Sequence, residues 1–239
     1  MITLYGMASP NVVKVFIALE ELGLPWDLKI VDVFAGKQFD DQFVKLNPNA
    51  KVPVLIDPDG PGGKTVTIFE SGAILIYLAE KTGKLLPKDG AQRYEALQWL
   101  MVQLTGQGPM SGQLVHFTRF APKGSDYSLA RYRTQVRNVY KAVDQRLATS
   151  PWMTGSEFGI ADIAFYPWTR TADMMAFLGE EKAKLTNLAR WFETMRARPA
   201  VQRANARQDA VRAETTAFDK ADPDTLDRFL QRGRWHVGT

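Results

Sequence analysis

Three short segments of the chain place polar side chains where a helix or a strand begins. In "MASPNVVKV", Ser9 and Asn11 flank Pro10 at the start of a predicted helix. A helix N-terminus has free N–H groups, and a hydroxyl and an amide beside them could hold a thiolate and lower its pKa from about 8.5. The alternative is that Ser9 only caps the helix, with proline near the first helical position, as is common.

The second segment, "FESGAIL", marks the end of one predicted strand and the start of a helix. A carboxylate could dock at this helix N-terminus with the help of the Ser71 hydroxyl. Glu70 beside it adds a negative charge where an ammonium could sit, so the pair suits the α-amino acid end of a ligand. Taken alone, however, serine before a helix is more often a simple cap and Glu70 a solvated acid.

The third segment, "NPNAKVPVL", has Pro53 at the mouth of an apolar strand pattern, although proline has no N–H to donate to a ladder. An X–Pro bond adopts the cis form at little cost. A cis Val52–Pro53 bond would leave the N–H and C=O of Val52 unpaired at the sheet edge, where a short peptide could join as an added strand. A trans proline tolerated in an edge strand is the equal alternative.

The composition excludes several kinds of site. The 239 residues include no cysteine and only two histidines, which excludes disulfides, thiolate metal sites, a cysteine nucleophile and a histidine-rich metal site. Any reactive sulfur must therefore come from a ligand. The net charge is +4, and the arginines near the C-terminus alternate with acidic residues. This alternation favours a solvated helix face over a nucleic-acid partner.

We expect a cytoplasmic protein with no membrane partner. The first residues, "MITLYGMASP", lack the basic and apolar regions of a signal peptide. No apolar run approaches the roughly 18 residues that a membrane-spanning helix needs.

The elements that must position the polar segments follow from the apolar patterns. In the first third of the chain the order β-α-β-α-β-β-α predicts a mixed sheet, parallel in its first half and closed by an antiparallel hairpin. The predicted strands are 2–6, 26–33, 52–57 and 65–70, and the predicted helices are 11–23, 40–47 and 71–83.

A short polar segment at 84–92 is typical of a linker, and the strand patterns end there. Helical periodicity then covers 93–106, 129–148, 160–179, 185–199 and 200–214. We therefore predict an α/β domain at 1–84, an all-helical domain at 91–208 and a C-terminal extension at 209–239 that wraps the surface.

This arrangement resembles the cytosolic glutathione transferases. The resemblance rests on "SPNVVKV", "LNPNAKVPVL", "ESGAILIYLAEKTG" and "SEFGIADIAFYPW", and it extends to about Arg207. With "QWLMVQLTGQGPMSGQLVHF", the chain looks most like the bacterial nu class, which is associated with glutathione-dependent disulfide reduction. The resemblance implies a thioredoxin-like α/β domain followed by an all-α domain, usually as a homodimer.

The resemblance also implies roles for individual residues. The proline of the "VP" motif is cis in that family, which favours a cis Val52–Pro53 bond whose backbone pairs with the cysteinyl part of glutathione. Glu70 and Ser71 match the positions that bind the γ-glutamyl end. Gln38 matches a side chain that reaches the glycyl carboxylate.

Two further matches concern the sulfur and the helical domain. Ser9 and Asn11 match the polar pair close to the sulfur, although many nu-class chains have threonine in place of the serine. Arg131 matches a helical-domain arginine that reaches toward glutathione, and Arg133 or Arg137 would serve if the alignment slips.

Glutathione is thus the expected co-substrate, and no metal is expected. We expect the protein to stabilise the glutathione thiolate with Asn11 and Ser9 and to direct it at a small electrophile or a disulfide. The alternative is a non-catalytic glutathione-binding or regulatory protein of the same fold.

Other residues are expected to be structural. Tyr5 is a rival sulfur ligand, because several classes use a tyrosine near the end of the first strand, but we expect it to pack in the sheet. Gly159 stands where the family usually has a Ser or Thr cap, and Asp162 is expected to bond back to the backbone of that cap.

An apolar pocket for the electrophile is expected among the aromatic and methionine side chains of the helical domain, with Met110 as a candidate wall. Trp168 and Trp191 are assigned to the core.

Overall fold

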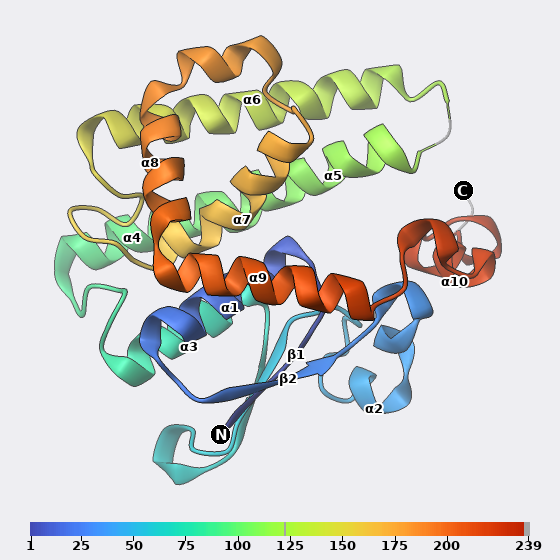
Figure 1. Ribbon diagram of the computed structural model, residues 1–239, viewed down its shortest axis with the longest axis horizontal. Coiled ribbons are helices and arrows are strands. Elements are labelled where there is room, and N and C mark those ends of the chain that lie inside the picture. Colours follow the sequence, from blue (N-terminus) through green and yellow to red (C-terminus); the bar gives the residue numbers. More distant parts are fainter. Residues whose placement is uncertain (122, 237–239) are drawn as a thin grey trace. The chain divides into compact units, whose positions relative to one another are not determined.

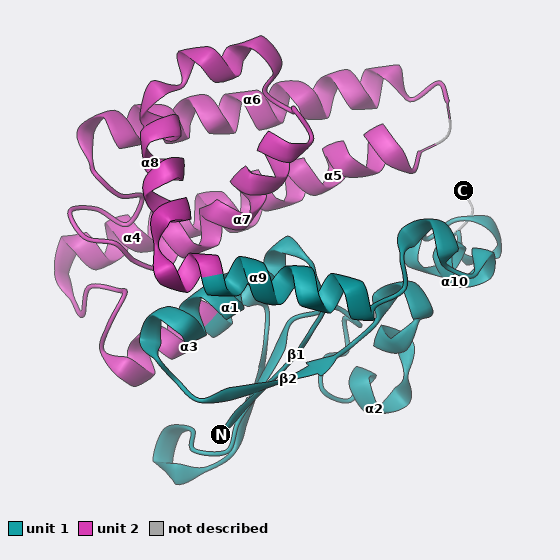
Figure 2. Cartoon of the chain, in the orientation of Figure 1, with its two compact units in different colours: residues 1–74, 203–239 teal, residues 75–202 magenta. Residues whose placement is uncertain are grey.

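Two compact units make up the chain in the computed structural model, which describes residues 1–121 and 123–236 (Figure 2). Unit 1 contains residues 1–74 together with the chain from residue 203 onward, and unit 2 contains residues 75–202. Unit 1 holds a four-stranded sheet with its helices, and unit 2 is helical, so the predicted fold class is confirmed. The described residues include no helix with the length and apolar character needed to span a membrane.

The sheet of unit 1 is mixed, as predicted. Strand β1 pairs in parallel with β2, and β3 pairs antiparallel with both β1 and β4, in the order β2-β1-β3-β4. In this register Tyr5, Val54 and Phe69 are neighbours across three strands. The end of β1, the start of β3 and the end of β4 therefore meet at one end of the sheet, which we call the Val54 end. The strands are β1 (Ile2–Gly6), β2 (Trp26–Ile30), β3 (Val54–Asp57) and β4 (Val66–Phe69).

Helix α1 (Pro10–Leu22) connects β1 to β2 and has clear start and stop signals. Ser9 caps its N-terminus, proline follows at the first position, and Gly23 ends it in the left-handed conformation with φ 63°. The last residue of β1 must be glycine, because a Cβ on Gly6 would lie 2.6 Å from Cγ1 of Val12. The helix therefore packs closely against the strand that precedes it.

The connection between β2 and β3 differs from the prediction. The apolar pattern predicts a strand up to residue 33, but β2 ends at Ile30. The carboxylate of Asp32 accepts hydrogen bonds from two backbone N–H groups, at 3.1 and 3.2 Å, and so starts the 3-10 helix η1 (Val33–Ala35). The short helices η2 (Lys37–Phe39) and α2 (Asp41–Val44) follow.

Helix α9 (Pro199–Glu214) belongs to unit 1 from Arg203 onward. Nε2 of Gln208 donates a hydrogen bond to the backbone oxygen of Ala8 at 3.3 Å. Nε of Arg203 forms an ion pair with Glu20 at 2.6 Å. These contacts connect a distant part of the sequence to the turn before α1 and to α1 itself.

The chain after α9 contains a helix that the sequence analysis does not predict, drawn in red in Figure 1. Asp222 caps this helix, α10 (Pro223–Leu230). Its carboxylate accepts a hydrogen bond from the backbone N–H of Thr225 at 2.9 Å. The rings of Phe218 and Phe229 lie edge-on to Phe34 of η1, with centroids 5.6 and 5.5 Å apart. The C-terminal residues therefore form a packed part of unit 1 that covers η1.

Unit 2 is a bundle of helices in which α6 packs against both α5 and α8 (Figure 1). Helix α5 is not among the predicted helices, because Gly108 and Pro109 are typical of a break. Proline nevertheless fits the first turn of a helix, where its missing N–H costs little. The helices are α4 (Gly90–Val102), the π-helical turn η4 (Gln103–Gln107), α5 (Gly108–Arg119), α6 (Asp126–Thr149), α7 (Ile160–Met174) and α8 (Thr186–Ala197).

Asp162 is a buried polar centre of unit 2. Its carboxylate accepts hydrogen bonds from the backbone N–H of Met153 at 2.7 Å, the backbone N–H of Gly159 at 3.1 Å and Nε1 of Trp191 at 2.7 Å. The predicted bond to the cap and the core position of Trp191 are confirmed. A Cβ on Gly159 would collide with the carbonyl oxygen of Leu85, which explains the absence of Ser or Thr at this cap.

Gln107 is a second buried polar centre, at the end of η4. Its Nε2 shares two N–H groups among three acceptors: the Tyr140 hydroxyl at 2.9 Å, Oγ1 of Thr169 at 3.0 Å and the carbonyl of Phe165 at 3.2 Å. Its Oε1 accepts a hydrogen bond from Gln103 at 3.2 Å. These bonds satisfy the polar atoms that the π-helical turn brings into an apolar interior.

Candidate functional site

The Val54 end of the sheet gathers the three polar segments that the sequence singles out. Ser9 and Asn11 follow β1, Val52 and Pro53 precede β3, and Glu70 follows β4. Because Tyr5, Val54 and Phe69 are neighbours in the ladder, the three connections leave the sheet at the same end.

Ser9 and Asn11 lie in the first turn of α1. Oγ of Ser9 accepts a hydrogen bond from the backbone N–H of Val12 at 3.4 Å, so Ser9 is a helix cap. Accepting this bond leaves the hydroxyl proton of Ser9 available for donation. Asn11 is half-buried at the second helical position. Their roles near a sulfur atom stay predictions.

The Val52–Pro53 peptide bond is cis, which confirms the prediction from the resemblance. Pro53 is buried, and the ladder of β3 starts one residue later, at Val54. In the described part of the chain, the N–H and C=O of Val52 form no backbone hydrogen bond. This backbone is therefore available to pair with an extended ligand.

Glu70 and Ser71 form the start of helix α3 (Ser71–Thr82), which begins in unit 1 and continues into unit 2. Glu70 is exposed, has a φ of 72°, and accepts the backbone N–H of Ile74 through its carbonyl at 3.0 Å. Ser71 is buried at the first helical position. The pair thus combines a carboxylate with a helix N-terminus and its hydroxyl, which suits a ligand with an ammonium and a carboxylate.

Lys14 is a site residue that the sequence analysis missed. It lies on α1, is 1% exposed, and donates a hydrogen bond from Nζ to Oγ of Ser71 at 3.3 Å. Burial lowers the pKa of Lys14 from 10.5 to about 7, and the nearby charge of Glu70 opposes this change. The sequence does contain a signal for it: in "VVKVFIAL", Lys14 is the single charged residue among apolar ones.

Gln38 lies in η2 and is 2% exposed. Its Oε1 and Nε2 are both buried without a hydrogen-bond partner among the described residues. The C-terminal residues pack beside it, because the guanidinium of Arg228 lies 3.9 Å from the ring centroid of Phe39. The Thr216 N–H also donates to Asp32 at 2.7 Å. The amide of Gln38 is thus held in place by its surroundings while its own hydrogen-bonding capacity is unused.

Arg131 belongs to α6 of unit 2, where its side chain is exposed. Arg133 is also exposed and Arg137 is half-buried on the same helix. Their roles in ligand binding stay predictions.

Tyr5 packs in the sheet, as predicted. It lies against the cluster formed by Val31, Phe43 and Val54, and the centroid of its ring is 6.3 Å from that of Phe43. In unit 2, Trp168 is buried, which confirms its assignment to the core. The half-buried Met110 on α5 stays a candidate pocket wall.

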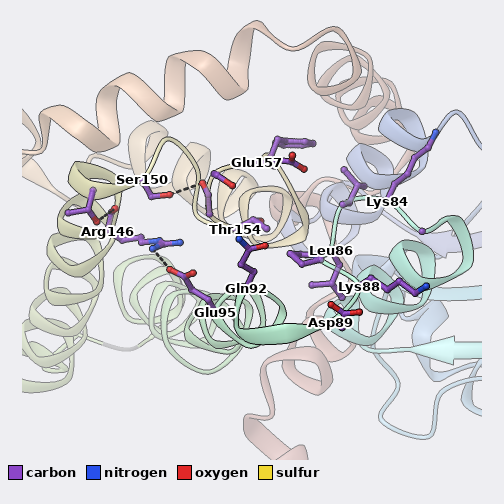
Figure 3. A pocket seen from close by; sticks show the side chains of 17 residues that line it. Lys84, Leu86, Lys88, Asp89, Gln92, Glu95, Arg146, Ser150, Thr154 and Glu157 are labelled. Atoms are coloured by element: carbon purple, nitrogen blue, oxygen red, sulfur yellow. Dashed lines mark hydrogen bonds and ion pairs between the residues drawn. The ribbon is translucent and has the colours of Figure 1, made fainter.

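A separate hollow of about 860 Å³ lies within unit 2 (Figure 3). Its wall is polar, and Nη1 of Arg146 forms an ion pair with Glu95 across it at 2.5 Å. None of the residues predicted to bind a ligand lines this hollow. Nor do the residues at 1–121 and 123–236 contain a group of acidic, histidine or cysteine side chains that could hold a metal ion.

Comparison with known protein families shows to which family this chain belongs. The chain matches the family model "Glutathione S-transferase, N-terminal domain" over residues 8–81 and "Glutathione S-transferase, C-terminal domain" over residues 126–194. The protein belongs to the glutathione S-transferase family. The three segments at the Val54 end of the sheet are therefore part of a glutathione S-transferase fold.

Similar proteins of this family come from bacteria. The disulfide-bond oxidoreductase YfcG of Escherichia coli is 40% identical over 205 residues, which cover 85% of this chain and 94% of that protein. A glutathione transferase family member from Pseudomonas fluorescens, solved with two glutathiones bound, is 40% identical with a TM-score of 0.81, covering 85% of this chain and 91% of that one.

A third similar protein was solved with an oxidised ligand. It is a glutathione transferase from Pseudomonas putida with one glutathione disulfide bound per subunit. Its identity to this chain is 39% and its TM-score is 0.78, with 85% of this chain and 90% of that one covered.

Proposed function

We propose that this protein is a glutathione-dependent enzyme that reduces disulfide bonds of small molecules. The observation that carries the proposal is the convergence of the α1 N-terminus, the Val52 backbone and the Glu70–Ser71 pair at the Val54 end of the sheet. Its similarity to a protein named as a disulfide-bond oxidoreductase supports the proposal.

Glutathione would bind along this end of the sheet. The backbone of Val52 would pair with the cysteinyl residue, as an added strand does. The carboxylate of the γ-glutamyl end would dock at the α3 N-terminus beside Ser71, and its ammonium would face Glu70. The glycyl carboxylate would accept a hydrogen bond from the amide of Gln38, whose donor has no partner among the described residues.

Asn11 and Ser9 would donate hydrogen bonds to the sulfur. Each hydrogen bond to a charged group is worth about 1.5–3 kcal/mol, so each of them lowers the thiol pKa by about one to two units. Because the chain has no cysteine, the glutathione thiolate is the only thiol nucleophile at this site.

The reaction takes two thiol–disulfide exchanges. The first thiolate attacks one sulfur of the substrate disulfide, forms a mixed disulfide and releases the other half as a thiolate, which then takes up a proton. A second glutathione thiolate attacks the glutathione sulfur of the mixed disulfide, releases the remaining thiol and yields glutathione disulfide. Structures of similar proteins with two glutathiones and with glutathione disulfide support this order.

Transfer of glutathione to small electrophiles is a second activity of the same thiolate, and we propose that the protein acts as a homodimer, as the family usually does. The test is steady-state turnover of glutathione with bis(2-hydroxyethyl) disulfide, run beside 1-chloro-2,4-dinitrobenzene. We expect fast disulfide reduction and slow conjugation. Fast conjugation with little disulfide reduction would contradict the proposal, and binding of glutathione without either activity would favour a non-catalytic binding protein.

A further inference from the structure

Lys14 is a charged side chain in a place that normally holds an apolar one. Its neighbours along α1, from Val12 to Leu19, are all buried, and Lys14 itself is 1% exposed. Removing an ammonium from water costs several kcal/mol, so buried lysines are rare unless a partner or a function requires them. Packing of α1 alone would be served better by a valine or a methionine.

The contacts of Lys14 point to the α3 N-terminus. Its Nζ lies 3.3 Å from Oγ of Ser71, and Glu70 is the charged group that acts on it. An ammonium only donates hydrogen bonds, so Oγ of Ser71 accepts from Lys14. The single hydroxyl proton of Ser71 is then directed away from Lys14 and can be donated to a ligand.

The start of α3 is an unfavourable place for the Lys14 ammonium. The first turn of α3 carries the positive end of the helix dipole, and the exposed Glu70 supplies a single negative charge. A ligand carboxylate at this N-terminus would add a second negative charge near Lys14. The pKa of Lys14, about 7, is low enough for such a neighbour to decide its charge at neutral pH.

We propose that Lys14 is a positioning residue that orients the Ser71 hydroxyl and supplies the buried positive charge for the α-carboxylate of the γ-glutamyl group. The inference rests on the proposed glutathione site. It adds a third group to Glu70 and Ser71 and explains the charge on the apolar face of α1. One of the two roles of Lys14 passes through Ser71, so the effects of removing the two side chains should not be additive.

The test uses Lys14→Met, which keeps the length of the side chain and removes its charge. The matched control is Lys64→Met, because Lys64 is exposed in unit 1, in the loop between β3 and β4. Binding is measured by calorimetry with glutathione, γ-glutamylcysteine and cysteinylglycine, and the melting temperature of each variant is recorded. Ser71→Ala and the double variant complete a mutant cycle.

We expect Lys14→Met to weaken binding of glutathione and γ-glutamylcysteine at least tenfold and to leave cysteinylglycine unchanged, with a melting temperature no lower than that of the wild type. The double variant should be weakened by less than the product of the two single effects, because one part of the Lys14 contribution passes through Ser71. Unchanged glutathione binding would overturn the inference and leave the proposed function intact. Equal weakening for all three ligands with a lower melting temperature would show a structural role only. Failure of the wild type to bind glutathione would contradict the proposed function itself.

Discussion

Replacement of Lys14 by methionine should stabilise the folded protein, and the gain should depend on pH. Methionine fills a similar volume and has no charge to desolvate, whereas the lysine is fully buried. The variant loses the hydrogen bond to Ser71, which is worth about 1 kcal/mol. The balance between these two effects can be worked out from the pKa of the lysine.

The unfolded chain keeps the Lys14 proton up to about pH 10.5, and the folded chain loses it near pH 7. Between these values the unfolded state binds more protons, so the stability of the wild type rises with pH. The difference between the two pKa values means that the buried charge of Lys14 destabilises the folded state by about 5 kcal/mol. The full destabilisation applies below about pH 7, and none of it remains above about pH 10.5. The net gain from Lys14→Met is therefore about 4 kcal/mol at pH 6, and it disappears toward pH 10.

Guanidinium unfolding followed by circular dichroism measures this difference at pH 6, 7.5 and 9. Lys64→Met serves as the control, because it removes an exposed charge and should change the free energy of unfolding little at any pH. A difference between wild type and Lys14→Met that does not change with pH would refute the argument that burial depresses the pKa. A less stable Lys14→Met would show that its contacts outweigh its desolvation.

Three further predictions concern the site, the C-terminal residues and the helical core. Asn11→Ala should lower the turnover of disulfide reduction about 10- to 100-fold, the equivalent of one hydrogen bond to a thiolate, and unchanged turnover would contradict the role of Asn11. Arg228→Ala removes the contact between Arg228 and Phe39 that covers η2, so the KM for glutathione should rise several-fold. The KM for γ-glutamylcysteine should not rise, because this ligand lacks the glycyl carboxylate that Gln38 is expected to bind. Asp162→Asn should destabilise the protein by about 3 kcal/mol, because an amide cannot accept all the buried donors. Asp89→Asn is its control, since Asp89 is exposed and asparagine caps a helix equally well; similar unfolding midpoints for the two variants would contradict the argument.

The elements that the sequence predicts well are those with local signals. The start of α1 follows from Ser9 and the proline after it, and its end from Gly23. The hairpin of β3 and β4 follows from the glycine-rich loop between them. These signals act over a few residues, so they need no knowledge of the tertiary structure.

Features whose local signals are ambiguous, or that depend on distant contacts, could not be predicted in the same way. The end of β2 is set by the capping carboxylate of Asp32, and an apolar pattern does not distinguish a strand from a short 3-10 helix. The glycines and proline at the start of α5 are typical of a helix break, although the chain continues there from α4 through η4 into α5. Lys14 contacts Ser71 only because α1 and the start of α3 meet in unit 1. The predicted glutathione contacts follow from the family resemblance, and the sheet register explains why Asn11, Val52 and Glu70 lie at the same end of the sheet.

The division of unit 1 between two separate parts of the sequence has a consequence for biosynthesis. Residues 1–74 leave the ribosome first, but their partners from Arg203 onward are made only after the whole of unit 2. Until then, the turn at Ala8 lacks its bond to Gln208, and Asp32 lacks its bond to Thr216. The nascent sheet therefore exists for a time without the segment that packs on the loop carrying Gln38. Glutathione added during translation would be expected to stabilise unit 1 only after this last segment has emerged.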